Sequence, residues 1–161
     1  MFNQLKAQLP NCPDEVIQTW LAPLAAVYGW PPAIFGPWSH ILLQRPLQFY
    51  QTLAWQKVAV VLNAFNLTPK ANAAVSGLID HNVHGVVNAY ADIANTGNRF
   101  SSLCDYIRAH GTLPVPPVVL REGFAYAILD GNHRIAAYNH VNGANANITG
   151  LVCWVASVPA A

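Results

Sequence analysis

The stretch Ala127-Ile128-Leu129-Asp130-Gly131-Asn132-His133-Arg134-Ile135-Ala136-Ala137-Tyr138 decides how the C-terminal third of the chain folds. Its first half is apolar and extends a strand-like segment, 124–129, that follows the turn residue Gly123. Its second half repeats apolar residues at spacings of three, and Gly143 then follows as a typical helix end. The stretch therefore predicts a strand that passes through a sharp turn directly into a helix.

The turn itself, Asp-Gly-Asn-His-Arg, has the composition of an anion-binding site. Backbone N–H groups at a helix start lack intrahelical partners, and the helix dipole is positive there. Gly131 allows another group to approach the backbone closely. His133 and Arg134 add donors that suit phosphate oxygens. A strand-to-helix turn of this kind predicts a phosphate site.

A purely structural interpretation of the same residues stays open. Asp130 could cap the helix while Gly131 eases the turn. Arg134 could form an ion pair with Asp130 or with Glu122. Short motifs match by chance often enough that five residues alone do not separate the two interpretations.

The composition indicates a single domain that contacts other protein surface. The chain has 161 residues, of which 53% are hydrophobic and only 9% are charged, against about 25% charged in average domains. A surface this apolar predicts that the chain forms a homo-oligomer or binds a protein partner through its apolar N-terminal half. The net charge is +1 and the eight Lys and Arg residues are scattered, which argues against an extended DNA-binding surface.

The cysteines and the N-terminus favour a cytoplasmic protein. Cys12, Cys104 and Cys153 are odd in number and far apart, which indicates free thiols in a reducing compartment. The first residues lack the pattern of a signal peptide. The uncharged span 16–44 is long enough to cross a bilayer, but four prolines and two glycines break it into short pieces. We therefore expect no membrane span.

Helical patterns dominate the first two thirds of the chain. A helix should begin at 13–15 and end or kink near Pro23, and the aromatic, Pro-rich loop 28–37 should anchor the core or an interface. The segment 55–65 is ambiguous between a buried strand and a helix, and we favour the helix. The remaining helices are expected at 38–44, 46–53, 69–80, 83–95 and 98–109.

The C-terminal third predicts strands. An extended segment at 114–120 leads into a first strand, and Gly123 then turns the chain into a second strand, 124–129. A last strand is expected at 148–158. The order, many helices followed by β-β-α-β, predicts an α+β fold with a small sheet. We expect one compact domain in which a helical N-terminal region, 1–97, packs on a core formed by 98–161.

Three segments together resemble the ParB/sulfiredoxin superfamily: Ser101–Ile107, Leu113–Leu120 and Asp130–Tyr138. The resemblance covers roughly residues 98–158 and includes the order helix, Pro-Pro strand, strand, Gly-x-His-Arg turn, helix, strand. It implies a ParB/sulfiredoxin-like small sheet that binds a nucleotide. Function varies within this superfamily, so the resemblance constrains the fold more than the chemistry.

The resemblance also implies which residues hold the ligand. Members bind nucleotide phosphates at the turn: sulfiredoxins have Gly-Cys-His-Arg there and use ATP, ParB proteins have Gly-Glu-Arg-Arg and bind CTP, and related free serine kinases transfer a phosphoryl group. Two positions on the preceding helix, Arg99 and Ser102, fall where sulfiredoxins help to hold ATP. The implied phosphate ligands are Gly131, Asn132, His133, Arg134, Arg99 and Ser102.

The departures from the family narrow the function. Asn132 replaces the sulfiredoxin cysteine, so reduction of a sulfinic acid is not expected. We expect an ATPase or an ATP-dependent phosphotransferase in which His133 and Arg134 offset phosphate charge, helped by Mg²⁺. Asp130 would bind the Mg²⁺ or act as general base. The alternatives are, first, a non-enzymatic protein-interaction module that retains the fold and, second, a ParB-like Mg²⁺-dependent nuclease.

Overall fold

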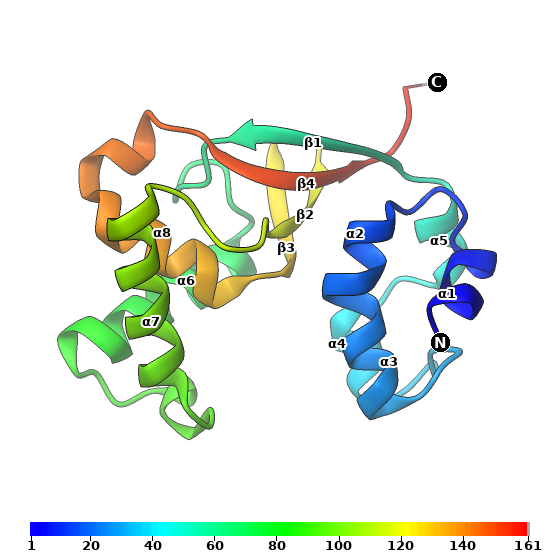
Figure 1. The fold of residues 1–161 in the computed structure, drawn as a ribbon, viewed down its shortest axis with the longest axis horizontal. Coiled ribbons are helices and arrows are strands. Elements are labelled where there is room, and N and C mark those ends of the chain that lie inside the picture. Colours follow the sequence, from blue (N-terminus) through cyan, green and yellow to red (C-terminus); the bar gives the residue numbers. More distant parts are fainter. Residues whose placement is uncertain (161) are drawn as a thin grey trace.

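A four-stranded sheet with strand order β1-β4-β2-β3 lies between two groups of helices (Figure 1). The computed structural model describes residues 1–160. The strands are β1 (Ala54–Val60), β2 (Val118–Glu122), β3 (Ala125–Asp130) and β4 (Leu151–Ser157). β4 pairs antiparallel with β1 and parallel with β2, and β2 pairs antiparallel with β3. The fold is therefore α+β, as expected from the order of elements.

The helices fall into two groups along the chain. The N-terminal group is α1 (Phe2–Gln8), α2 (Asp14–Val16), the π-helical η1 (Ile17–Leu21), α3 (Ala22–Tyr28), α4 (Pro37–Ile41) and α5 (Leu47–Gln51). The later group is α6 (Pro69–His84), the 3₁₀-helix η2 (Ala89–Asp92), α7 (Thr96–His110), α8 (Asn132–Asn142) and the 3₁₀-helix η3 (Gly143–Asn147).

The two groups cover opposite faces of the sheet, and each builds a hydrophobic core there (Figure 1). The central strand β2 shows this most clearly. Val118 and Leu120 belong to the core under α1–α5, while Val119 belongs to the core under α6–α8, and all three are 0% exposed. A strand that is buried on both faces reads as a continuous apolar run, as Val118–Leu120 does.

The segment 55–65 corrects our expectation of a helix. It forms the edge strand β1, which pairs in register with β4 from Ala54↔Ser157 to Val60↔Leu151. Its β-branched residues, Val58 and Val60, favour a strand, and the long-range pairing decides between the two conformations. The N-terminal region expected to be purely helical therefore contributes a strand to the sheet.

The helix expected at 83–95 is also wrong. α6 continues to His84 and ends at Gly85, which adopts the left-handed conformation (φ +70°) of a helix C-cap. Only the short 3₁₀-helix η2 follows before α7 begins at Thr96. Gly85 is the helix stop signal in the sequence, but the apolar residues around it follow a helical pattern, and we placed a helix across it.

Pro23 does not end the first long helix. α2, η1 and α3 run on continuously from Asp14 to Tyr28 (Figure 1). Proline lacks the backbone N–H that an α-helix interior requires. Here it lies at the beginning of α3, directly after the wider π-helical turn Ile17–Leu21. The helix ends instead at Gly29, which has φ +85°.

The loop 28–37 divides into a buried and an exposed part. Trp38, just after it, is buried, packs against Trp30 with ring centroids 5.5 Å apart, and donates its indole N–H to the carbonyl of Gly29 at 3.0 Å. Ile34 and Phe35 are almost fully exposed. The loop is therefore anchored in the core by tryptophans and presents its middle residues outward.

Among residues 1–160, none of the helices combines the length and hydrophobicity that crossing a bilayer requires. The uncharged span 16–44 is instead divided among η1, α3, the loop and α4. Much of its hydrophobicity lies in the core beneath α1–α5, where Trp20, Leu21 and Trp38 are buried.

We predict that Trp38→Ala lowers the free energy of unfolding by about 3–5 kcal/mol, because it leaves a large cavity in the core under α1–α5. Phe35→Ala is the matched control, since Phe35 belongs to the same segment but is 83% exposed. Its effect should stay within about 0.5 kcal/mol. Urea denaturation followed by circular dichroism measures both. Equal losses in the two variants would show that Trp38 is no core anchor.

Candidate functional site

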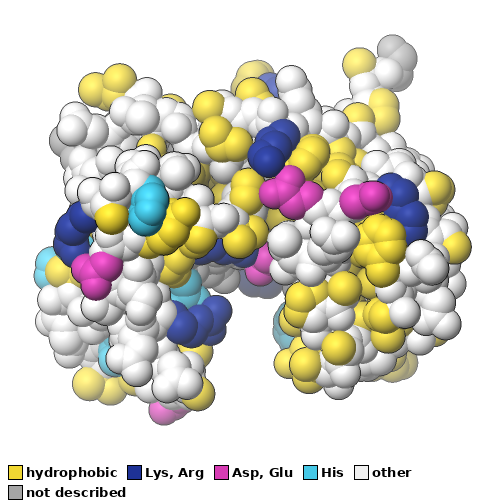
Figure 2. Space-filling view, viewed as in Figure 1, with side chains coloured by type: hydrophobic (Ala, Val, Ile, Leu, Met, Phe, Trp, Pro, Cys, Tyr) yellow, Lys and Arg dark blue, Asp and Glu magenta, His cyan; other side chains and the backbone are white. Residues whose placement is uncertain are grey.

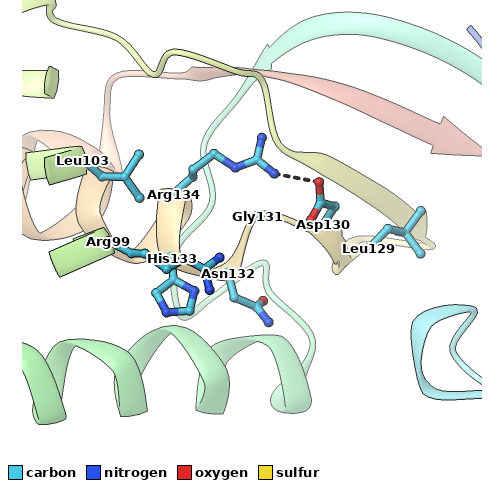
Figure 3. Close-up of a pocket in the computed structure, with 8 residues that line it drawn as sticks. All are labelled: Arg99, Leu103, Leu129, Asp130, Gly131, Asn132, His133 and Arg134. Carbon is cyan, nitrogen blue, oxygen red and sulfur yellow. Dashed lines mark hydrogen bonds and ion pairs between the residues drawn. The ribbon is translucent and has the colours of Figure 1, made fainter. Parts of the chain in front are cut away.

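A cavity of about 480 Å³ opens where β3 ends and α8 begins. Residues from three elements line it: two from α7, the end of β3, and the turn with the first residues of α8 (Figure 3). The lining residues are Arg99, Leu103, Leu129, Asp130, Gly131, Asn132, His133 and Arg134. The structure thus brings every residue of the Asp-Gly-Asn-His-Arg turn to one cavity, together with Arg99 from 30 residues earlier in the sequence.

The turn requires a glycine. Gly131 has φ +109°, outside the range of other residues, and a Cβ there would lie 3.0 Å from Cβ of Pro117 and 3.2 Å from the guanidinium of Arg134. No side chain of the described residues caps α8. The backbone N–H groups of Asn132, His133 and Arg134 also have no acceptor among residues 1–160. The first turn of α8 therefore keeps the unpartnered donors that an anion needs.

Arg134 is held by protein groups. One of its terminal nitrogens, Nη2, pairs with Oδ2 of Asp130 at 2.7 Å (Figure 3), and the other, Nη1, donates to the carbonyls of Val115 and Pro116 at 3.1 Å. Of the two acids weighed from the sequence, Asp130 is the partner, because Glu122 pairs with Arg45 at 2.7 Å. Arg134 lines the cavity, but its charge is already compensated. Its main contribution is to fix the turn.

His133 is neutral in this structure. Burial and the nearby charge of Arg99 together lower the pKa of His133 from 6.5 to about 4. Its Nε2 lies 3.1 Å from the hydroxyl of Thr96, the first residue of α7. A neutral imidazole offers a hydrogen bond but no positive charge, so His133 does not offset phosphate charge unless a bound anion raises its pKa.

Arg99 supplies the uncompensated charge of the cavity. It lies on the first turn of α7, it is exposed, and it forms no ion pair with any described acid. The contact between Thr96 and His133 also shows that the N-terminal ends of α7 and α8 meet here. The cavity therefore combines the positive N-terminal end of α8 with one free guanidinium from α7.

Ser102 does not join this group. It is exposed on α7 and does not line the cavity, whereas the next residue, Leu103, does. The sequence reasoning missed Leu103 and Leu129, which add apolar lining at opposite ends of the cavity (Figure 3). It also missed Thr96, whose contact with His133 spans 37 residues and has no signal in local spacing.

Asp130 has one carboxylate oxygen, Oδ1, with no hydrogen-bond partner among residues 1–160, since Oδ2 binds Arg134. Within the described part of the chain, no cluster of three or more His, Cys, Asp or Glu side chains could hold a metal ion by itself. Oδ1 therefore remains available to a further partner in the cavity.

The cavity lies beside a larger hollow of the molecular surface. Figure 2 shows a deep notch between the part of the molecule that contains α7 and the part that contains α3 and α4. The walls of the notch include basic and histidine side chains on the α7 side (Figure 2).

We predict that His133 makes the stability of the protein depend on pH. Above pH 6.5 the imidazole is neutral in both the folded and unfolded states. As the pH falls from 6.5 toward 4, the unfolded chain takes up a proton that the folded chain excludes, so stability is lost. Urea denaturation at pH 7.5 and pH 5 should show a smaller loss for His133→Gln than for the wild type. Identical losses would contradict the buried, neutral state of His133.

Comparisons with known proteins found no counterpart for this chain. No protein-family model matches the sequence. Neither the search of curated proteins nor the search of solved structures found a match. The function is therefore inferred from the chemistry of the cavity itself.

Proposed function

We propose that this protein binds the phosphate groups of a nucleoside triphosphate at the first turn of α8. One observation carries the proposal: three unpartnered backbone N–H groups and the uncompensated Arg99 line a single cavity of about 480 Å³. Backbone donors at a helix start and a guanidinium are the groups that bind phosphate oxygens in proteins. The cavity has the size of a small-molecule site, about 300–1,000 Å³.

The order of elements supports the same ligand. α7, β2, β3, α8 and β4 follow one another in the order that the ParB/sulfiredoxin resemblance implies. The Gly-x-His-Arg turn lies between β3 and α8, where that superfamily holds nucleotide phosphates. We propose on this basis that the C-terminal part is a ParB/sulfiredoxin-like nucleotide-binding unit.

The residues divide into those that bind and those that position. The N–H groups of Asn132, His133 and Arg134, with the side chains of Arg99 and His133, contact the phosphates. The Arg134 side chain positions the turn through its bonds to Asp130 and to the chain before β2. Leu103 and Leu129 add apolar lining at opposite ends of the cavity (Figure 3).

The chemistry that this arrangement supports is phosphoryl transfer, either to water or to an acceptor. Positioning and charge stabilisation supply most of the catalysis of phosphoryl transfer. The free Oδ1 of Asp130 would hold Mg²⁺ with phosphate oxygens, or accept the proton of the attacking hydroxyl. Mg²⁺ would contribute charge neutralisation at the phosphates.

A second candidate function is a non-enzymatic interaction module. The full engagement of Arg134 by Asp130 and two carbonyls favours it, because such a turn is stable without any ligand. The low charged fraction of 9% also favours contact with other protein surface. This candidate predicts that the cavity has no affinity for nucleotides.

We predict that Arg99→Ala weakens the binding of ATP about tenfold or more, because a charged hydrogen bond to phosphate contributes about 1.5–3 kcal/mol. The matched control is Arg108→Ala on the same helix, whose guanidinium is exposed and faces Asp105 at 3.5 Å. It should leave the affinity unchanged. Isothermal titration calorimetry with ATP, and with inorganic triphosphate, measures both.

Calorimetry also separates the two candidate functions. Binding of triphosphate without ATP preference would locate the affinity in the phosphate groups alone. Absence of heat with ATP, CTP and triphosphate alike would contradict the nucleotide-binding proposal and leave the interaction module. Arg134→Ala is a poor test, because removing its bonds to Asp130, Val115 and Pro116 disturbs the turn itself.

We predict that Asp130→Asn lowers Mg²⁺-dependent ATP hydrolysis by about 100-fold or more, as the loss of a metal ligand or general base does. The amide oxygen still accepts the hydrogen bond of Arg134, so the turn keeps its geometry. Binding of ATP without Mg²⁺ should persist or tighten, since a negative charge leaves the cavity. Unchanged turnover would restrict Asp130 to its ion pair with Arg134.

A further inference from the structure

The two edge strands of the sheet, β3 and β1, differ in whether another segment of the chain covers them. At the β3 edge the segment that leads into α6 covers the strand: the N–H of Tyr126 donates to the carbonyl of Asn66 at 2.7 Å, and the N–H of Thr68 donates to the carbonyl of Tyr126 at 3.0 Å. At the β1 edge no described segment forms such bonds, and β1 is the outermost strand of the sheet. β1 is the open edge of the sheet.

The direction of the free backbone groups follows from the pairing. The N–H of Trp154 donates to the carbonyl of Pro117, so the backbone N–H and C=O of Trp154 point toward β2. The backbone N–H and C=O of its neighbours, Cys153 and Val155, point the opposite way, toward β1. Cys153 lies opposite Val58 in the antiparallel pair, which directs the N–H and C=O of Val58 toward β4. The backbone groups of Lys57 and Ala59 therefore point outward and have no partner among residues 1–160.

β1 lacks the features that protect edge strands from pairing with another chain. It is seven residues long, contains no proline, and pairs with β4 without a register shift. Its one charged residue, Lys57, does not block the edge. Its ammonium group lies 3.0 Å from the carboxylate of Glu15 and 5.6 Å from the ring centroid of Trp154, over the face of the sheet.

We propose that β1 pairs antiparallel with β1 of a second copy of this chain, across a two-fold axis at Val58. The two sheets then form one continuous sheet through an isologous interface. In this register the outward backbone N–H and C=O of Lys57 lie opposite those of Ala59 of the partner subunit. The outward groups of Ala59 lie opposite those of Lys57 of the partner subunit. Val58 then lies directly opposite Val58 of the partner subunit.

The side chains suit this register. Val58 is 37% exposed and would face Val58 of the partner subunit, at a Cβ distance of about 5 Å. Lys57 lies opposite Ala59 of the partner subunit, so no lysine faces a lysine. The net charge of +1 gives little repulsion between two copies.

Other occupants are less consistent with this edge. A strand from an unrelated protein would supply the same backbone bonds, but nothing in β1 selects a particular side-chain pattern in it. A second copy supplies the matching apolar residue at the centre by symmetry. The apolar composition of the chain also implies burial of surface between protein molecules.

The test uses the full chain in analytical ultracentrifugation. We expect the wild type to sediment at twice the chain mass of 17.5 kDa. Val58→Lys should sediment as a monomer, because two lysines would face each other at the axis. Val83→Lys is the matched control: Val83 is 38% exposed, nearly the same as Val58, but lies on α6, and this variant should remain a dimer. Circular dichroism establishes that each variant is folded.

Two further variants keep the proposal falsifiable if Val58→Lys perturbs the fold. Ala59→Pro removes an outward N–H without touching the ladder to β4, and should also give monomers. Mixing Val58→Lys with Val58→Glu should restore a dimer, because opposite charges then meet at the axis. A monomeric wild type at about 100 µM, where any micromolar dimer is populated, overturns the proposal. A dimer that survives both Val58→Lys and Ala59→Pro overturns it as well.

Discussion

The guanidinium of Arg134 is the constraint on which the candidate site depends. It joins three pieces of chain that local structure alone would leave independent: the end of β3 through Asp130, the segment before β2 through Val115 and Pro116, and α8, which carries it. A partly buried arginine with this many partners is costly to release, because each partner would be left without its hydrogen bond. The turn is consequently held in place before any ligand arrives, and its N–H groups remain without an acceptor at the cavity. Rigid, preoriented donors are the kind that bind an anion without losing conformational entropy.

That constraint also separates the roles of neighbouring residues. Sequence reasoning treats His133 and Arg134 as two cationic ligands of the same phosphate. In the structure Arg134 is neutralised by Asp130, His133 is uncharged with a pKa of about 4, and Arg99 retains a free charge. The electrostatic attraction for an anion therefore comes from one helix, α7, and the directional hydrogen bonds come from another, α8. The approach of Thr96 to His133 holds these two helix ends together.

The sequence predicts the parts of this protein that are determined locally. The strand, turn and helix around Gly131 follow from apolar periodicity and from a glycine at a position with φ +109°. The start of α6 at Thr68 and Pro69 follows from capping chemistry, since the Thr68 hydroxyl accepts from the N–H of Ala71. β1 could not be predicted in this way, because its partner β4 lies about a hundred residues later and long-range pairing outweighs helix propensity. The contact of His133 with Thr96 and the bonds of Arg134 to Val115 and Pro116 also join residues far apart in the sequence, and local patterns do not predict them.

The position of β4 has a consequence for how the chain reaches its folded state. β4 is the last strand in the sequence, yet it lies between β1 and β2 in the sheet. Its residues enter both cores, Ala156 on one face and Cys153 on the other. Neither layer can close until this strand is in place, so both apolar surfaces stay incomplete until β4 has paired with β1 and β2. Slow, non-local closure of this kind makes protection by a molecular chaperone valuable for this protein during translation.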